Sequence, residues 1–251
     1  MPGKVIAVSD ARVLQDRDVG ADRERPTLAD RFAPLGRAWR PIVATWLALF
    51  AVVTTLGLLL VGPLDRSRII DWDLDVANWF VDQRTATWTT LAEAGTWLAE
   101  TITVPVVVIV AIMVAWRVST NVAAPVFLAV SVGGEKLLYL LSSLIIGRDR
   151  PPVPTVGTTY ATSSFPSGHV ASAVTLYGGI ALVIALHRSG AVRAALLAVV
   201  GVVATVVALC RMYTGFHYLS DSVAGALMGG IWLAVLYRTV LLPAESPRST
   251  S

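Results

Sequence analysis

The sequence predicts an all-α fold, an integral membrane bundle of six transmembrane helices. Of the 251 residues, 55% are hydrophobic and only 15% are charged, whereas a soluble domain carries about a quarter charged residues. The apolar residues gather in runs of about twenty, the length that an α-helix needs to cross a hydrocarbon core. These runs lack an alternation of period two, which argues against barrel strands.

Residues 39–242 hold these runs and form the predicted membrane domain. Residues 1–38 are polar, mix arginine with acidic residues and contain no apolar stretch near Met1. We therefore expect a disordered cytoplasmic N-terminal tail and no cleavable signal peptide. The short polar segment 243–251 is expected to be a second disordered cytoplasmic tail.

Six apolar segments are expected to cross the membrane, which puts both termini on one side. They are 42–62, 101–118, 122–146, 168–187, 191–210 and 219–242. In the last segment Gly225 and Gly229 lie four residues apart, a spacing that allows two helices to pack closely.

Arginines at the segment ends give the orientation, because cytoplasmic loops are rich in Arg and Lys. One side of the membrane carries Arg40, Arg117, Arg188, Arg193 and Arg238. We expect this side, with both termini, to be cytoplasmic. The extracytoplasmic side then holds the connections 63–100, 147–167 and 211–218.

The long 63–100 connection is acidic and rich in tryptophan, with Trp72, Trp79, Trp88 and Trp97. Tryptophan favours the headgroup layer, where its apolar ring and polar N–H are both accommodated. We expect short amphipathic helices on the outer membrane surface. A re-entrant or transmembrane piece at 85–99 is the alternative, although it is too short to span alone.

The other two outer connections, and the segment ends beside them, are unexpectedly basic. They carry Arg148, Arg150 and Arg211, together with His169 and His217. The 42 residues from His169 to Arg211 are enough to cross the membrane and return, since about 20 residues cross once. These side chains should therefore meet at one membrane face.

Such a cluster of arginines and histidines predicts an anion site. Guanidinium groups match the oxygens of a phosphate. The Ser167-Gly168-His169 sequence begins a predicted helix, whose free N–H groups and positive dipole end favour an anion. The Ser167 hydroxyl can add a hydrogen bond.

His217 and Asp221 are four residues apart, so they share one face where the last helix begins. Asp221 can accept the proton of one ring nitrogen and leave the other free to act as a nucleophile. His169 then serves as the general acid for the leaving oxygen.

These motifs resemble the three-part signature of the type 2 phosphatidic acid phosphatase family over about residues 100–240. The family's wider superfamily includes lipid phosphate phosphatases, bacterial undecaprenyl pyrophosphate phosphatases and vanadium haloperoxidases. The residues that carry the resemblance are Arg150-Pro151, Pro166-Ser167-Gly168-His169, Arg211, His217 and Asp221.

The resemblance implies a metal-independent phosphatase without a cofactor. His217 would be the nucleophile that forms a phosphohistidine, Asp221 would hold its ring, and His169 would protonate the leaving group. The phosphoryl oxygens would be held by Arg150, Arg211, Ser167 and the amide of Gly168.

The sequence departs from the family at two positions. Ser143 stands where the family has a lysine, and Cys210 where it usually has a serine. Arg148 is the nearest substitute for the lysine and is expected to bind phosphate. Lys136 lies two turns deeper, roughly 10 Å away by helix rise, and is expected to fall short of the phosphate or only to approach it. Lys136 and its neighbour Glu135 are intramembrane charges, which favours a functional or packing role.

We therefore expect a phosphatase acting at the outer leaflet on a lipid phosphomonoester or pyrophosphate. The candidate substrates are undecaprenyl pyrophosphate, phosphatidic acid and phosphatidylglycerol phosphate, and the oligomeric state is open. The expected partners are the lipid phosphate substrate and membrane lipids, and not nucleic acid; the formal net charge of +3 is too small to indicate nucleic acid. The lone Cys210 excludes an intrachain disulfide and a cysteine-based metal site. The alternatives are a weakly active or inactive lipid-phosphate binder, a transporter or flippase, and a vanadate-dependent peroxidase.

Overall fold

The computed structural model describes residue 36 and residues 38–119, 121–157 and 162–245, and all regular structure in these ranges is helical. Five helices are long and apolar enough to cross a membrane. They are α3 (Trp39–Val61), α7 (Ala123–Ile146), α8 (Gly168–Ala185), α9 (Gly190–Tyr213) and α10 (Leu219–Leu236), which the π-helical turn η3 (Tyr237–Leu241) extends.

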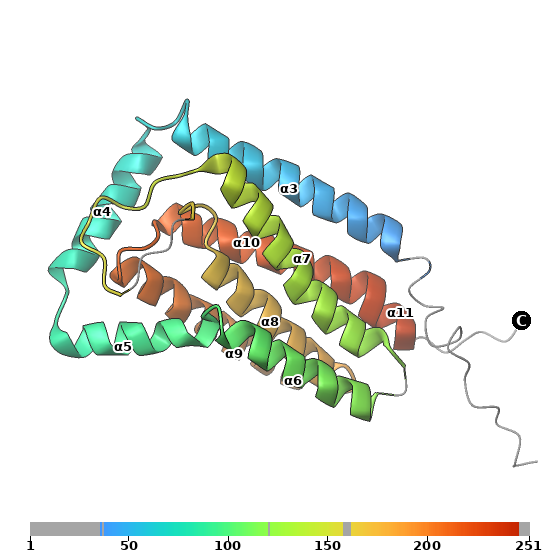
Figure 1. Ribbon diagram of the computed structural model, residues 1–251. Coiled ribbons are helices and arrows are strands. Elements are labelled where there is room, and N and C mark those ends of the chain that lie inside the picture. The colour runs from blue at the N-terminus through green and yellow to red at the C-terminus, as the bar shows by residue number, and fades with distance from the viewer. Residues whose placement is uncertain (1–35, 37, 120, 158–161, 246–251) are drawn as a thin grey trace, which may run out of the picture.

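A sixth span is formed by a bent pair. The helix α5 (Ala86–Thr96) and the short 3₁₀ turn η2 (Trp97–Ala99) lead into α6 (Thr103–Val118) with a bend of 42°. The predicted six-helix membrane bundle is thereby confirmed. Helix α5 packs beside α9 and runs on into α6 (Figure 1), which agrees with the alternative of a re-entrant or transmembrane piece at 85–99 and not with a surface helix there.

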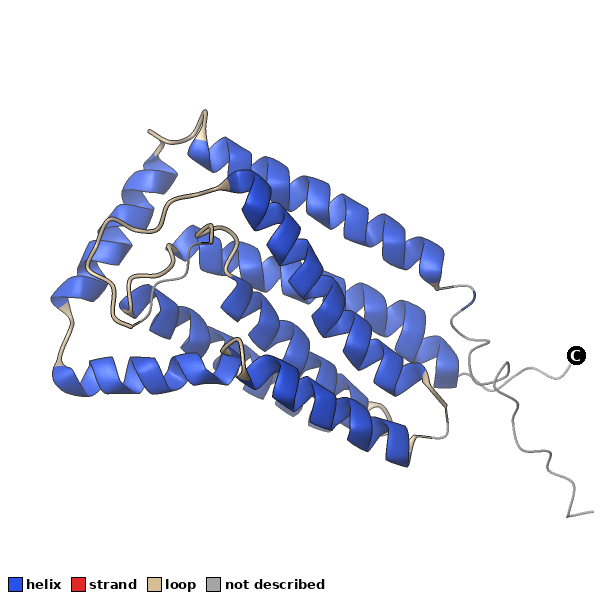
Figure 2. Cartoon of the chain, in the orientation of Figure 1, coloured by secondary structure: helices blue, strands red, loops and turns tan. Residues whose placement is uncertain are grey.

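One end of the bundle gathers the connections that were predicted to be extracytoplasmic. The helix α4 (Arg68–Asp82) crosses this end, next to the loop after α7, while the start of α3 and the short α11 (Leu242–Glu245) lie at the opposite end (Figure 1). Helices and their connecting loops make up every described part of the chain (Figure 2).

Many large apolar side chains on the outer helices are exposed, including Leu47, Val52 and Leu56 on α3 and Val199 and Val202 on α9. An exposed apolar surface of this extent is unusual for a soluble monomer and is typical of a lipid-facing one. The described part of the chain is therefore a multi-pass membrane protein.

Helix α10 packs directly on the backbone of α8. A Cβ added at Gly225 would lie 2.4 Å from the carbonyl oxygen of Ser167, and one at Gly229 would lie 2.9 Å from that of Ala171. The close packing predicted from these two glycines is confirmed. It brings the start of α10 beside the start of α8.

The end of α7 is fixed by Gly147, whose φ of 61° is left-handed and suits glycine. The chain beyond it is pinned to the segment before α8. Ser164 donates its backbone N–H to the carbonyl of Arg148 at 2.8 Å, and Arg148 donates its own to the Ser163 hydroxyl at 2.9 Å.

The predicted N-terminal tail, 1–38, lies outside the described residues except for residues 36 and 38. Of the predicted C-terminal tail, only 243–245 are described, and these belong to α11 instead of being irregular.

Candidate active site

A cavity of about 170 Å³ lies where the outer connections meet. Its volume is several times the roughly 30 Å³ that one water molecule occupies in the liquid, so one phosphoryl group fits. Five predicted site residues line it, from four separate parts of the chain. The lining residues are Ala99, Thr101, Lys136, Tyr139, Arg150, Thr162, Gly168, His169, Arg211 and His217.

His217 is held by its Nδ1 atom, which lies 2.8 Å from the backbone carbonyl oxygen of Ser164 and 3.5 Å from Asp221 Oδ2. Because a carbonyl only accepts, Nδ1 carries the proton and Nε2 keeps a lone pair. Burial lowers the pKa of His217, although the Asp221 carboxylate opposes this. The ring is therefore neutral near pH 7, as a nucleophile requires. The sequence indicated Asp221 as the orienting group, but the Ser164 carbonyl is the closer partner.

Asp221 lies in the first turn of α10 and is completely buried. Its Oδ2 accepts the backbone N–H of Tyr218 at 2.9 Å and the hydroxyl of Ser164, and its Oδ1 accepts from Arg148. A buried carboxylate needs such partners to remain charged. Asp221 therefore joins the segments before α8 and α10 into one rigid unit.

Arg148 is one of two predicted phosphate ligands, with Ser167, that do not line the cavity. Its guanidinium is buried between Asp221 and Asp73, 2.8 Å from Asp73 Oδ2, and lies over the Tyr218 ring. Burial acts to lower the pKa of Arg148, but the two carboxylates outweigh it and raise the pKa. The physical reason is charge pairing, since the two buried carboxylates hold this guanidinium between them.

Asp73 was not singled out from the sequence, where it is one of several acids in the 63–100 connection. It lies on α4 and shares the buried face of that helix with Ala77. Its Oδ1 accepts the backbone N–H of Ser220 at 2.9 Å. Asp73 therefore ties α4 to the start of α10.

Arg150 and Arg211 lie on the same aromatic ring. Their guanidinium carbons are 5.4 and 4.3 Å from the centroid of Phe216. Arg150 donates to the Phe216 carbonyl at 2.8 Å, and burial lowers its pKa. Two guanidiniums anchored in this way present a fixed pair of cations to the cavity.

Ser167 and Gly168 begin α8, as predicted, but they contribute differently. The Ser167 hydroxyl is buried and caps the helix by accepting the N–H of Val170 at 3.5 Å; it does not line the cavity. Gly168 does, and a Cβ there would lie 3.0 Å from the ring of Tyr139. First-turn amides have no helical carbonyl before them and can bind an anion.

Lys136 lines the cavity, although helix rise from Ser143 suggested that it would fall short. Gly168, which also lines the cavity, packs against Tyr139, less than one turn from Lys136 on α7. The ammonium nitrogen lies 4.0 Å from Glu135 Oε2. Ser143 itself is buried and donates its hydroxyl to the Leu140 carbonyl at 3.0 Å.

His169 has an acidic neighbour that the sequence analysis also missed. Its Nε2 lies 3.6 Å from Glu100 Oε2, and Glu100 lies at the bend between η2 and α6. An acid at the edge of an apolar segment was the available signal. In the described part of the chain, no group of three His, Cys, Asp or Glu residues is arranged to hold a metal ion.

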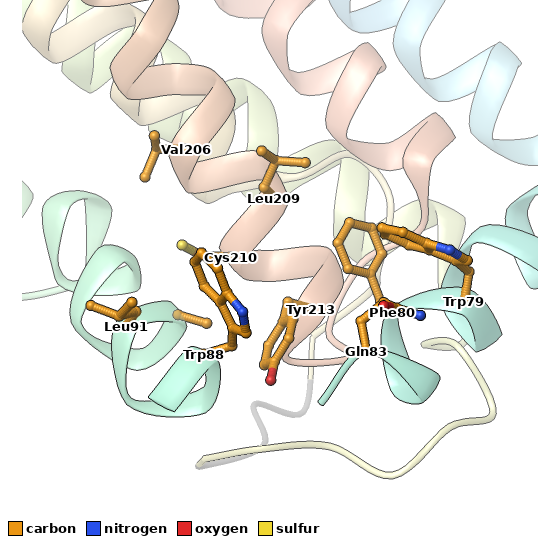
Figure 3. A pocket seen from close by; sticks show the side chains of 10 residues that line it. Trp79, Phe80, Gln83, Trp88, Leu91, Val206, Leu209, Cys210 and Tyr213 are labelled. Atoms are coloured by element: carbon orange, nitrogen blue, oxygen red, sulfur yellow. The ribbon is translucent and has the colours of Figure 1, made fainter. Parts of the chain in front are cut away.

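An apolar groove of about 630 Å³ lies along the last two turns of α9. Trp79 and Phe80 from α4 and Trp88 from α5 form its walls, with Cys210 and Tyr213 from α9 (Figure 3). Cys210 directly precedes Arg211, so the groove lies close to the phosphate-sized cavity.

The chain is similar to known proteins in fold and in family pattern. The family model described as PAP2 superfamily matches residues 124–242. A solved structure, the transmembrane PAP2 type phosphatidylglycerolphosphate phosphatase from Bacillus subtilis, superposes with a TM-score of 0.65 at 19% identity. The match covers 87% of this chain and 99% of that one. A search of curated proteins found no match. The matched region includes every predicted site residue, and residues 124–242 belong to the PAP2 superfamily.

Proposed function

We propose that this protein is a metal-independent lipid phosphatase that works through a phosphohistidine at the extracytoplasmic face. One observation carries the proposal: a single phosphate-sized cavity is lined by a histidine with a free Nε2, a second histidine and three cationic side chains. The superfamily's phosphatase chemistry fits this set of side chains.

The reaction follows from the roles of these groups. The Nε2 lone pair of His217 attacks phosphorus, the bond from phosphorus to the ester oxygen breaks, and protonated His169 gives its proton to that oxygen. In the second step His169 takes a proton from water, which attacks the phosphohistidine and releases phosphate. Arg150, Arg211 and Lys136 stabilise the charge on the phosphoryl oxygens throughout.

A lipid substrate is supported by the apolar groove beside the cavity, which suits a hydrocarbon chain. Undecaprenyl pyrophosphate, phosphatidic acid and phosphatidylglycerol phosphate are the proposed substrates. The last is also the lipid named for the structurally similar B. subtilis enzyme. The basic ends of the helices opposite the cavity support cytoplasmic termini and an extracytoplasmic site.

The test is phosphate release by the purified protein from these three lipids in mixed micelles, with wild type beside His217→Ala. We expect His217→Ala to lose at least about 10³-fold in kcat, because removing a nucleophile disables the whole catalytic unit. His187→Ala is the matched control, since His187 is exposed and far from the cavity, and it should keep the wild-type rate.

An acid-labile phosphate label on wild type, absent from His217→Ala, would identify the intermediate. Equal release by wild type and His217→Ala would remove His217 as the nucleophile. Lipid binding without release by wild type would favour the binding protein instead.

A further inference from the structure

We propose that Glu100 is a positioning residue for His169: its carboxylate holds the Nε2–H of the imidazole, so that Nδ1 serves as acid and then as base. This inference rests on the proposed function, because it assigns a partner to the proposed general acid. Glu100 lies outside the residues that the family signature contains.

The carboxylate of Glu100 is itself oriented. It occupies the bend between η2 and α6, where its backbone carbonyl accepts the N–H of Val104 at 3.0 Å. Its Oε1 accepts the N–H of Thr101 at 3.1 Å. The other oxygen, Oε2, faces His169 Nε2 at 3.6 Å. The bend in the sixth span therefore delivers a carboxylate to the second histidine.

The distance of 3.6 Å is longer than a formed hydrogen bond, which has a donor–acceptor distance of about 2.7–3.2 Å. Catalytic hydrogen bonds are often long in structures without substrate and shorten when substrate binds. His169 Nε2 is buried and makes no hydrogen bond among the described residues. Glu100 is thus within ion-pair reach of a ring nitrogen that needs an acceptor.

The surroundings of His169 make a carboxylate necessary. Arg150, Lys136 and Arg211 line the same cavity from the loop after α7, from α7 and from α9. His217 and Tyr139 complete its titratable lining, while the Glu135 carboxylate is engaged by Ser172 and Lys136. Three nearby cations disfavour an imidazolium ion, and an opposite charge beside the ring offsets this.

Holding the proton on Nε2 also determines which ring nitrogen exchanges protons with the substrate and with water. When His169 donates from Nδ1 to the leaving oxygen, the neutral ring keeps its Nε2 proton on Glu100. The lone pair then appears on Nδ1, where it can accept the proton of the attacking water. One carboxylate therefore allows the same nitrogen to work in both steps, as in other carboxylate–histidine pairs.

The experiment compares Glu100→Gln and Glu100→Leu with Glu93→Gln. Glu93 is an exposed acid on α5 that lines, together with Glu100, a second cavity that does not include His169, so its variant should match wild type. Each protein is assayed with phosphatidic acid, whose alkoxide must be protonated to leave, and with p-nitrophenyl phosphate, whose phenolate leaves readily.

We expect Glu100→Leu to lower kcat on phosphatidic acid about 10- to 100-fold, within the range that general acid catalysis supplies. KM should change less than about twofold. The kcat on p-nitrophenyl phosphate should fall less than about threefold, because this substrate needs the same phosphate contacts but little protonation of its leaving group. Glu100→Gln keeps an acceptor without the charge and should lie between Glu100→Leu and wild type. An equal loss on both substrates would overturn the proposal, because a general structural defect does not distinguish leaving groups.

Nitrogen NMR of ¹⁵N-labelled histidine gives a second measurement that needs no turnover. The chain has only three histidines, and His169→Ala assigns the signal of interest. At a pH where the ring is neutral, wild type should show His169 with the proton on Nε2, and Glu100→Leu should show a mixture of tautomers. The same tautomer in both proteins would overturn the inference, even if wild type released no phosphate and the proposed function had failed.

Discussion

The two histidine–carboxylate pairs of the site are built to different degrees of rigidity. In the pair of His217 and Asp221 the side chains are 3% and 0% exposed, and in the pair of His169 and Glu100 they are 14% and 18% exposed. Asp221 is held by bonds from Tyr218, Ser164 and Arg148, whereas the carboxylate of Glu100 is oriented by its neighbour Thr101.

This difference matches the two chemical tasks. A nucleophile reacts best when its ring is fixed in line with phosphorus, so burial and many bonds help it. An acid that later becomes a base must exchange a proton with the leaving group and with water, so it needs access. The buried ion pairs of Arg148 with Asp73 and Asp221 therefore lie beside His217 and not beside His169.

The largest expected effect comes from removing the cation that serves the rigid pair. Arg148→Met leaves the buried carboxylates of Asp73 and Asp221 without their guanidinium. Loss of one partner of a buried ion pair costs about 3–5 kcal/mol. We expect a fall in Tm of several degrees in detergent, measured by the thermal unfolding of the purified protein, with loss of phosphate release.

Arg66→Met is the control for this prediction, because Arg66 is an exposed arginine at the same end of the molecule. It should leave Tm unchanged. An unchanged Tm for Arg148→Met would mean that the buried charges do not make the His217 side rigid, and the comparison between the two pairs would lose its basis.

A smaller effect is expected at Lys136, which belongs to neither pair. Lys136→Met removes one of the three cations that line the cavity. A hydrogen bond to a charged group contributes about 1.5–3 kcal/mol, so kcat/KM should fall roughly 10- to 100-fold, chiefly through KM. Steady-state kinetics on the preferred lipid measures this fall in kcat/KM. Arg117→Met is the control, because Arg117 is exposed at the other end of the bundle. A wild-type KM would show that the ammonium does not touch phosphate.

The smallest effect concerns the position where the family has its lysine. Ser143 lies seven residues after Lys136, on the same face of α7. Adding Ser143→Lys to Lys136→Met should restore a few-fold of the lost kcat/KM, because an ammonium would again reach the cavity from this face. No recovery, in a variant with unchanged Tm, would mean that the two positions do not serve one phosphate.

The helices and most of the cavity could be predicted because membrane spans have a fixed length. That constraint places His169 and Arg211 at one face without any knowledge of packing. It could not show which arginine meets a carboxylate, so Arg148 was assigned to phosphate instead of to Asp73 and Asp221. Asp73 and Glu100 depend on how α4 and the bend before α6 pack, and sequence spacing does not encode this. Helix rise alone also did not show that Lys136 lines the cavity, because this depends on the packing of Gly168 against Tyr139.

The absent side chain of Gly225 has a consequence for catalysis itself. The backbone of α10 rests on the Ser167 carbonyl, and two residues beyond that carbonyl is His169, while His217 precedes α10 by two residues. The distance between His169 and His217, which an incoming phosphate must bridge, is therefore set by a backbone-to-backbone contact. No rotamer change can absorb an error there, and a single added methyl group would alter the working distance of the two imidazoles.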